Sequence, residues 1–154
     1  MENEEVEYAG FWIRSGATLI DTILFLMIAW PLLFMIYGSD YLEMSSNSFA
    51  IGSADVVINY IFPLVAAVIL WVNKAGTPGK LVLGLRVVDA QSGEHLSFGQ
   101  AIGRYFAYIP AMIPLMMGLF WVGWDSKKQG WHDKLAGTVV IRQKNRTEKV
   151  QFSK

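Results

Sequence analysis

The chain has 154 residues, of which 53% are hydrophobic and 17% are charged, and its mean hydropathy is +0.34. Soluble domains carry roughly 25% charged residues, so this composition is typical of a membrane protein and disfavours a soluble one. Equal numbers of acidic and basic residues give zero net charge, which disfavours nucleic-acid binding. The absence of cysteine excludes disulfides, thiol catalysis and Cys-ligated zinc.

The first long apolar segment covers residues 11–37. About 20 apolar residues are enough for a helix to cross the hydrocarbon core, so we expect a membrane helix here, with Trp12, Trp30 and Tyr37 as interfacial aromatics. The residues before it are acidic, unlike the basic start of a secretory signal, so we expect the helix to remain in the mature protein. Residues 38–52 are polar and contain no Lys or Arg, which predicts that this loop faces away from the cytoplasm.

A second apolar segment, residues 54–72, predicts a second membrane helix that Pro63 could kink. The connector that follows, residues 73–100, contains basic residues and turn signals, which predicts a cytoplasmic location. Residues 81–89 and 137–142 are rich in β-branched residues. We expect them to pair as short strands in a small cytoplasmic β-hairpin or sheet.

The third apolar segment, residues 101–124, contains Pro110 and Pro114, which remove backbone donors and favour a break in the helix. The tail, residues 125–154, is strongly basic, which predicts that it is cytoplasmic and that the third segment re-enters on the side where it began. A straight tilted third crossing remains the alternative. The predicted fold is therefore a single all-α membrane domain over residues 1–154, with two transmembrane helices, a broken third segment and a small sheet.

Three stretches of the chain carry a family pattern. They are Ala-Gly-Phe-Trp-Ile-Arg at 9–14 with Ile-Asp at 20–21, Gly-Thr-Pro-Gly-Lys at 76–80 with Gly-Leu-Arg-Val-Val-Asp at 84–89, and Gln-Gly-Trp-His-Asp-Lys-Leu-Ala-Gly-Thr-Val-Val at 129–140. Together they resemble the RDD family, named for one arginine and two aspartates. The resemblance places the arginine at Arg14, the first aspartate at Asp21 and the second at Asp133, with Asp125 as an alternative. It implies a multi-pass membrane protein for which transport, in some relatives sodium/proton exchange, has been suggested.

Arg14 and Asp21 are seven residues apart, so they share one face of the first helix about 10 Å apart along its axis. An ionised carboxylate at the depth of Asp21 costs at least ~2.5 kcal/mol unless it is paired, hydrated or protonated. It should face the protein interior. Two interpretations remain: a proton or cation site, or a structural counter-charge for a basic residue of the third segment, with Arg104 the obvious partner.

Three further residues could belong to a polar site. Asn59 lies one turn after Asp55 on the second helix, where a packing hydrogen bond is expected more than ion binding. Lys80 follows a turn that lacks the spacing of a phosphate loop, and we expect it to reach lipid phosphates. His132 is either a pH-responsive contact or a surface capping residue. Two histidines without a carboxylate cluster predict no metal site, and no cofactor is expected.

These features favour a small transport or cation/proton exchange component of a bacterial inner membrane, with Asp21 as its protonatable group. Three membrane segments cannot enclose a pathway alone, so a homo-oligomer is expected. The alternative is a non-transporting adaptor or assembly factor that docks a protein partner or anionic membrane lipid on its cytoplasmic face. No catalytic arrangement is readable, so we do not expect an enzyme.

Overall fold

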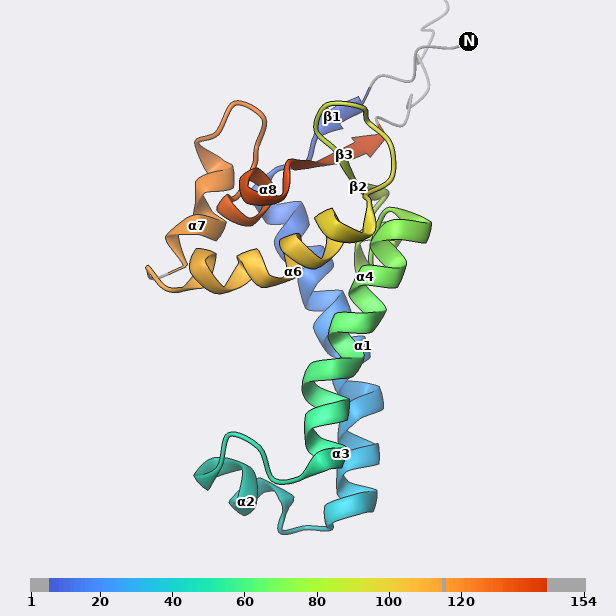
Figure 1. Cartoon of the computed structure of the whole chain (residues 1–154), viewed down its shortest axis with the longest axis vertical. Coiled ribbons are helices and arrows are strands. Elements are labelled where there is room, and N and C mark those ends of the chain that lie inside the picture. Colours follow the sequence, from blue (N-terminus) through green and yellow to red (C-terminus); the bar gives the residue numbers. More distant parts are fainter. Residues whose placement is uncertain (1–5, 115, 144–154) are drawn as a thin grey trace, which may run out of the picture.

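Two long apolar helices form the axis of the protein in a computed structural model that describes residues 6–114 and 116–143 (Figure 1). Helix α1 covers Phe11–Tyr37, which is the predicted first membrane helix. The second continuous helix begins at Ser53 and consists of α3 (Ser53–Val56), the π-helical turn η1 (Val57–Ile61) and α4 (Phe62–Lys74). Both are long and apolar enough to cross a membrane, so the prediction of two transmembrane helices is confirmed.

The π-helical turn lies directly before Pro63. Proline cannot donate a backbone hydrogen bond and its ring crowds the carbonyl of the residue four positions earlier, here Asn59. A π turn widens the helix locally and is a common site of helix distortion. The distortion expected from Pro63 therefore occurs in the π-helical turn, and α4 continues as a regular helix to Lys74.

The loop between the two long helices lies at the end of the molecule opposite the sheet (Figure 1). It contains the short helix α2 (Tyr41–Asn47). The side chain of Tyr41 is buried against Ala29 and Leu33 of α1. This small apolar cluster fixes the loop onto the far end of α1.

The connector after α4 folds into a short helix, α5 (Pro78–Val82), and then strand β2 (Leu85–Asp89). The strand predicted over residues 81–89 therefore begins only at Leu85. Pro78 at the first helical position favours a helix at this point, and Gly84, with φ +70°, supplies the left-handed residue that separates helix from strand.

A three-stranded antiparallel sheet closes this end of the molecule, in the order β1-β3-β2. Strand β3 covers Thr138–Gln143 and pairs with β2 so that Val87 lies opposite Val140. The other edge is β1 (Val6–Tyr8), a strand that the sequence did not predict. The three strands share one sheet, and β1 precedes α1, β2 follows α4 and β3 follows the third apolar segment. The start of α1, the end of α4 and the chain after the third segment therefore all lie at the sheet end of the molecule.

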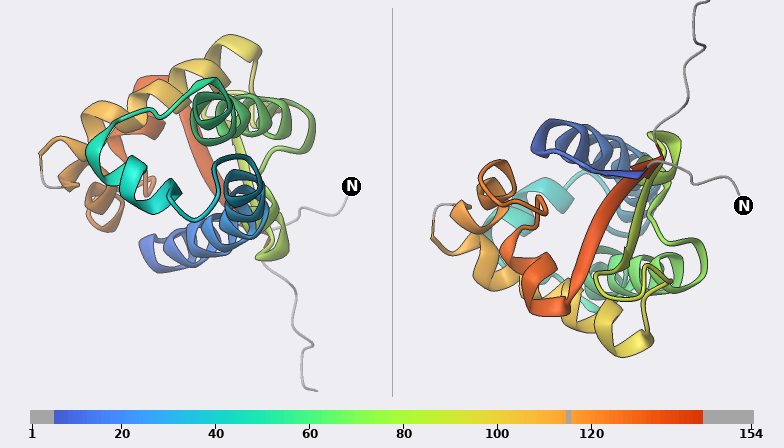
Figure 2. Two further views of the ribbon diagram at one scale, coloured as in Figure 1. Left: turned by 90° about the horizontal axis from the view of Figure 1, so that it is seen from below. Right: turned by 90° about the horizontal axis from the view of Figure 1, so that it is seen from above.

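The third apolar segment is bent rather than straight. Helix α6 (Phe98–Met112) and the following α7 (Met117–Phe120) with η2 (Trp121–Gly123) differ in direction by 114°. They extend sideways from the α1–α4 pair (Figures 1 and 2). The predicted break is therefore confirmed, and the bent pair is a third candidate span beside the two long helices. That the segment re-enters on the side where it began stays a prediction.

The third apolar segment is followed by α8 (Trp131–Ala136), which packs on α6 and leads into β3. Helix α6 keeps its course through Pro110, and the reversal comes later, where Met116 adopts a left-handed conformation with φ +59°. Residues 144–154 of the predicted basic tail lie outside the described part of the chain.

The main core joins the sheet to the inner ends of the helices. Leu85, Val87 and Val140 of the sheet pack against Trp71 of α4 and Ala101 of α6, and all five are almost fully buried. At about 25 cal/mol per Å² of apolar surface, burial of these side chains is the main force that holds α6 against the helix pair. The core therefore fixes the end of the molecule where the family residues meet.

Candidate functional site

Arg14 and Asp133, 119 residues apart, form an ion pair at the junction of α1 and α8, with Nη1 2.5 Å from Oδ2. The other carboxylate oxygen of Asp133 accepts a hydrogen bond from Nη1 of Arg104 on α6. Asp133 is completely buried and Arg104 is 1% exposed. One carboxylate therefore binds two arginines at the point where α1, α6 and α8 meet.

Backbone groups orient the Arg14 guanidinium. Its Nε donates to the carbonyl of Ala9 at 2.9 Å and its Nη2 to the carbonyl of Lys128 at 2.5 Å. Ala9 lies between β1 and α1, and its own N–H donates to the carbonyl of Val140 in β3. Arg14 thus ties the start of α1 to the loop before α8 as well as to Asp133.

Arg104 is held by a second set of contacts. Its Nη1 also donates to the hydroxyl of Thr138 at the start of β3, and its guanidinium carbon lies 5.2 Å from the ring centre of Trp71. A cation over an aromatic face gains electrostatic attraction, and Trp is the best partner for it. Nothing in the sequence pattern pointed to Thr138 or Trp71 as partners, because their contacts depend on the fold.

Asp133 also caps α8. The N–H of Gly130 donates to Oδ2 at 3.0 Å, so the carboxylate closes the first turn of the helix. Burial alone would raise the pKa of Asp133, but the positive charges of Arg104 and Arg14 and the bond from Gly130 hold the pKa below its usual range. The carboxylate is therefore ionised at neutral pH.

His132 is buried, not on the surface as the capping interpretation expected. Its ring stacks on Tyr108 of α6 with the ring centres 4.1 Å apart. Burial, together with the nearby charges of Arg104 and Arg14, lowers the pKa of His132 to about 3, although the charge of Asp133 opposes this shift. The imidazole is therefore neutral at physiological pH, because folding removes it from water.

Asp21 binds the connector and not Arg104, so the predicted pairing of these two residues is wrong. Its Oδ2 accepts a hydrogen bond from the hydroxyl of Thr77 at 2.5 Å, and its Oδ1 accepts one from the N–H of Gly79 at 2.7 Å. The carboxylate thus caps the first turn of α5, a role that a carboxylate fills well because helix N-termini carry unpaired N–H groups. Arg104 is already engaged by Asp133.

The Gly-Thr-Pro-Gly-Lys stretch provides the close approach that this cap requires. A β-carbon at Gly79 would clash with the carbonyl oxygen of Ala17 and would lie 3.0 Å from the Asp21 carboxylate. Only glycine lets the backbone of α5 lie this close to α1. Thr77 and Gly79 are therefore positioning residues of the site, and their place in the motif is the sequence signal that could have identified them.

Asp125, the alternative position for the second signature aspartate, pairs with Lys134 instead. The hydrogen bond from Lys134 lowers the pKa of Asp125. The Lys134 side chain is 44% exposed, so this is a surface ion pair. Since Asp133 is the aspartate that contacts Arg14, the structure favours Asp133 as the second signature residue.

Asn59 lies in η1, which directly follows α3 at the end of the molecule opposite the sheet (Figure 1). Its amide donates to Asp55 at 2.7 Å and to the hydroxyl of Tyr41 at 3.1 Å. Asp55 is 4% exposed and also accepts from the N–H of Ile51. The structure therefore separates Asn59 from the other predicted site residues and places it in a packing cluster.

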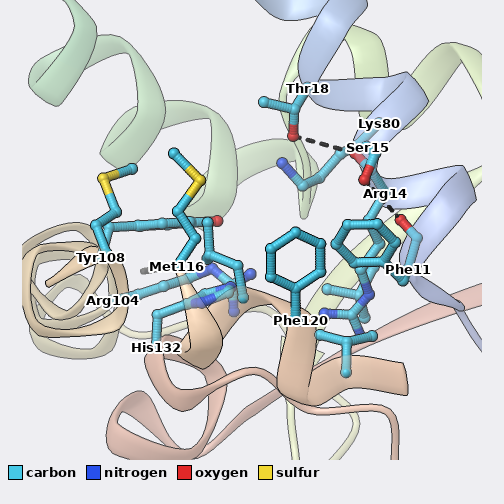
Figure 3. A pocket seen from close by; sticks show the side chains of 14 residues that line it. Phe11, Arg14, Ser15, Thr18, Lys80, Arg104, Tyr108, Met116, Phe120 and His132 are labelled. Carbon is cyan, nitrogen blue, oxygen red and sulfur yellow. Dashed lines mark hydrogen bonds between the residues drawn. The ribbon is translucent and has the colours of Figure 1, made fainter. Parts of the chain in front are cut away.

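A cavity of about 320 Å³ opens beside the arginine–aspartate network (Figure 3). Arg14, Lys80, Arg104 and His132 supply its polar lining from four different segments. The rest of the lining is mainly apolar and includes Phe11, Met112, Met116, Leu119 and Phe120. The cavity is at the low end of the volumes typical of small-molecule sites and combines cationic and apolar walls.

The chain is similar to known proteins over most of its length. The family model described as RDD family matches residues 8–137. The chain is 33% identical over 147 residues to the Bacillus subtilis protein YxaI, covering 86% of this chain and 96% of that protein. It is 30% identical over 142 residues to the Bacillus subtilis membrane protein YteJ, covering 89% and 82% respectively. A Rickettsia prowazekii protein, RP437, is 40% identical over 72 residues, which cover 47% of this chain and 39% of that protein.

No solved structure matches the chain. The family match extends over most of the sequence and includes all three residues of the Arg14, Asp21 and Asp133 signature, which the fold gathers around one end of the helix pair. The chain is an integral membrane protein that belongs to the RDD family.

Proposed function

We propose that this protein is a small transport component of a bacterial inner membrane, that it works as a homo-oligomer, and that its solute enters or leaves at the cavity beside Arg14 and Arg104. The observation that carries the proposal is the position of this cavity. It lies at the end of a membrane helix pair and is built from the family's own signature region. Polar and ionisable groups at such a position are the usual mark of a solute pathway.

The distribution of charge supports a cytoplasmic location for the cavity and the sheet. All the lysines and arginines among residues 6–114 and 116–143 lie at this end or in its loops, and the 38–52 loop at the other end has none. Basic loops are retained on the cytoplasmic side of the inner membrane. On this proposal the N-terminus and the basic tail are cytoplasmic.

The surfaces of α1 and α4 support an oligomer. Large apolar side chains remain exposed along both helices, among them Met27 and Met35 of α1 and Val65 and Ile69 of α4. Within a single chain these two helices cannot surround a pathway. Several copies of the chain could together enclose a pathway, while the outward faces of their helices contact lipid.

The charge of the cavity favours an anion over a cation as the solute. A cation/proton exchanger needs a carboxylate free to bind its ion, but both oxygens of Asp133 accept from arginines and both oxygens of Asp21 accept from the connector. Three cationic side chains face the same cavity. Cation exchange through Asp21 is therefore the less well supported form of the transport proposal.

A flux measurement on the full-length protein in sealed liposomes tests the proposal. Octanesulfonate, a permanently charged anion with a short apolar chain, should generate an inside-negative potential reported by a voltage-sensitive dye. Lys80→Gln should lower the initial rate about tenfold, equivalent to about 1.4 kcal/mol of transition-state stabilisation. Lys74→Gln, the same change at an exposed position at the end of α4, should leave the rate unchanged.

Parallel liposomes that contain a pH-sensitive dye test cation exchange with sodium, potassium and lithium. A cation-driven pH change that Asp21→Asn abolishes would overturn the anion form of the proposal. The absence of both fluxes would overturn transport altogether.

An adaptor is the second candidate, and the exposed strand β1 favours it. The side chains of Val6 and Tyr8 are 54% and 39% exposed at one edge of the sheet. Among the residues that the structure describes, no further strand lies beyond β1, and an exposed edge can accept a strand from a partner. The adaptor would be supported if the protein showed no flux and bound a partner protein through the β1 edge.

A further inference from the structure

Lys80 places a buried positive charge in the cavity without a carboxylate beside it. The residue is 6% exposed, and its Nζ makes one long contact, 3.4 Å to the hydroxyl of Thr77. No ion pair joins it to any acid in residues 6–114 or 116–143. A buried charge without a partner is costly, so a counter-ion in the cavity would stabilise it.

The surrounding charges leave room for one anion. Arg14, Arg104 and Lys80 are three cations, whereas Asp133 and Asp21 are the two carboxylates that contact this group directly or through Thr77. One positive charge therefore remains in excess. Two buried nitrogens of cavity-lining side chains, Nε of Arg104 and Nδ1 of His132, also lack a hydrogen-bond partner within the described chain.

The opposite wall of the cavity suits an apolar chain. Met112, Met116 and Phe120 line it and are themselves 49%, 52% and 47% exposed. Flexible methionines adapt to apolar ligands of varied shape. Figure 3 shows Met116 and Phe120 facing the space that Lys80 enters from the other side. An ion without an apolar part would leave this wall unused.

The cavity is lined by residues near the start of α1, a helix long enough to cross a membrane, and lipid headgroups are expected beside the end of such a helix. Arg14 comes three residues after the start of α1, which is about 4.5 Å along the helix axis. A ligand with its charge at Arg14 and Lys80 could therefore extend its apolar part toward the hydrocarbon region. This places charge and chain in the orientation of a membrane amphiphile.

We propose that the cavity binds the anionic end of an amphiphile, a phosphate monoester or carboxylate on an apolar chain, with Lys80 as its counter-charge and Met112, Met116 and Phe120 beside the chain. Binding itself does not require transport. Only the movement of the bound amphiphile across the membrane rests on the proposed function.

Calorimetric titration of the full-length protein in maltoside detergent with dodecyl phosphate tests the proposal. Saturable binding is expected, with inorganic phosphate at least about tenfold weaker because it cannot use the apolar wall. Dodecyltrimethylammonium, which has the same chain and the opposite charge, should not bind. Equal affinity for inorganic phosphate and dodecyl phosphate, or saturable binding of the cationic amphiphile, would overturn the amphiphile assignment.

Two pairs of variants locate the site. Lys80→Gln should raise the dissociation constant for dodecyl phosphate about tenfold or more, whereas Lys74→Gln should change it less than about twofold. Thr18 lines the cavity from α1 and is exposed, so Thr18→Glu adds a competing carboxylate at little cost to folding. Thr18→Glu should weaken binding about tenfold while Thr18→Gln, its neutral match, should retain it.

The Thr18 pair keeps the test decisive if Lys80→Gln does not fold. Equal binding by Thr18→Glu and Thr18→Gln, or no saturable binding by the wild type, would overturn the proposal. Binding without anion flux would retain this inference and remove the transport function. Anion flux without dodecyl phosphate binding would retain the transport function and remove this inference.

Discussion

The guanidinium of Arg14 and the carboxylate of Asp133 join the first and last parts of the family signature, with Nη1 2.5 Å from Oδ2 and both residues buried. A second arginine, Arg104, uses the other oxygen of the same carboxylate. A buried ion pair contributes little over a well-packed apolar alternative, but removal of one partner leaves an uncompensated charge. Asp133 is therefore the residue whose loss the fold should tolerate least.

Asp133→Asn should lower the free energy of unfolding by about 3–5 kcal/mol, because two buried arginines lose their counter-charge. Denaturant titration in mixed detergent measures this change. Asp125→Asn is the matched control and should cost less than about 1 kcal/mol, since its partner Lys134 is half-exposed. Equal losses of unfolding free energy in the two variants would show that the Asp133 network contributes no more to stability than the surface ion pair of Asp125.

Asp21→Asn should cost about 1 kcal/mol, the typical value for a weakened helix cap, because the amide retains only one acceptor for Thr77 and Gly79. The additional change Arg104→Gln should not rescue the loss, since the two side chains are not partners. A double-mutant cycle measures their coupling energy. A coupling energy above about 1 kcal/mol would instead support the pairing of Asp21 with Arg104.

Gly79→Ala should destabilise the protein by about 1–3 kcal/mol, because the new methyl group overlaps the carbonyl of Ala17 and separates α5 from α1. Gly103→Ala is the matched control: a β-carbon there meets nothing within 4 Å in the described structure, and Gly103 is inside α6. That change should stabilise by about 0.5–1 kcal/mol through helix propensity. Loss of stability in both variants would contradict the close approach at Gly79.

Acid should destabilise the folded protein through His132. Its pKa is about 3 when folded and 6.5 as a free side chain, so between these values the unfolded chain binds a proton that the folded chain does not. The contribution to stability is complete above pH 6.5 and decreases as the pH falls toward 3. Thermal unfolding midpoints from pH 7 to 4 should therefore fall less steeply in His132→Phe than in wild type. His95→Gln, at an exposed position, should follow the wild-type curve.

The long helices and two of the strands could be predicted from sequence because their signals are local. An uninterrupted apolar run determines α1, and β-branched residues determine β2 and β3. Strand β1, only three residues long and exposed, carries no such pattern and exists because β3 offers it an edge. Local signals therefore identified the elements whose own composition carries a pattern, including two strands whose pairing partners are distant in sequence.

The site was predictable only in part, because its contacts join distant segments. The family resemblance identified Arg14, Asp21 and Asp133, but spacing within one helix could not reveal that Asp21 caps α5 while Arg104 pairs with Asp133. One of the two interpretations of His132, the capping residue, placed it at the surface. Its burial results from packing against α6, a contact that no local pattern records.

The account depends most on both ends of the third apolar segment lying on one side of the membrane, since this places the cavity in reach of the cytoplasm. The chain has no native cysteine, so single cysteines report accessibility directly. Ser46, Ser92 and Ser126 are exposed in α2, in the turn after β2 and in the loop before α8, respectively. With an impermeant maleimide on intact spheroplasts, Ser46→Cys should be modified, whereas Ser92→Cys and Ser126→Cys should react only after permeabilisation. Modification of Ser126→Cys together with Ser46→Cys, while Ser92→Cys stays protected, would contradict the account.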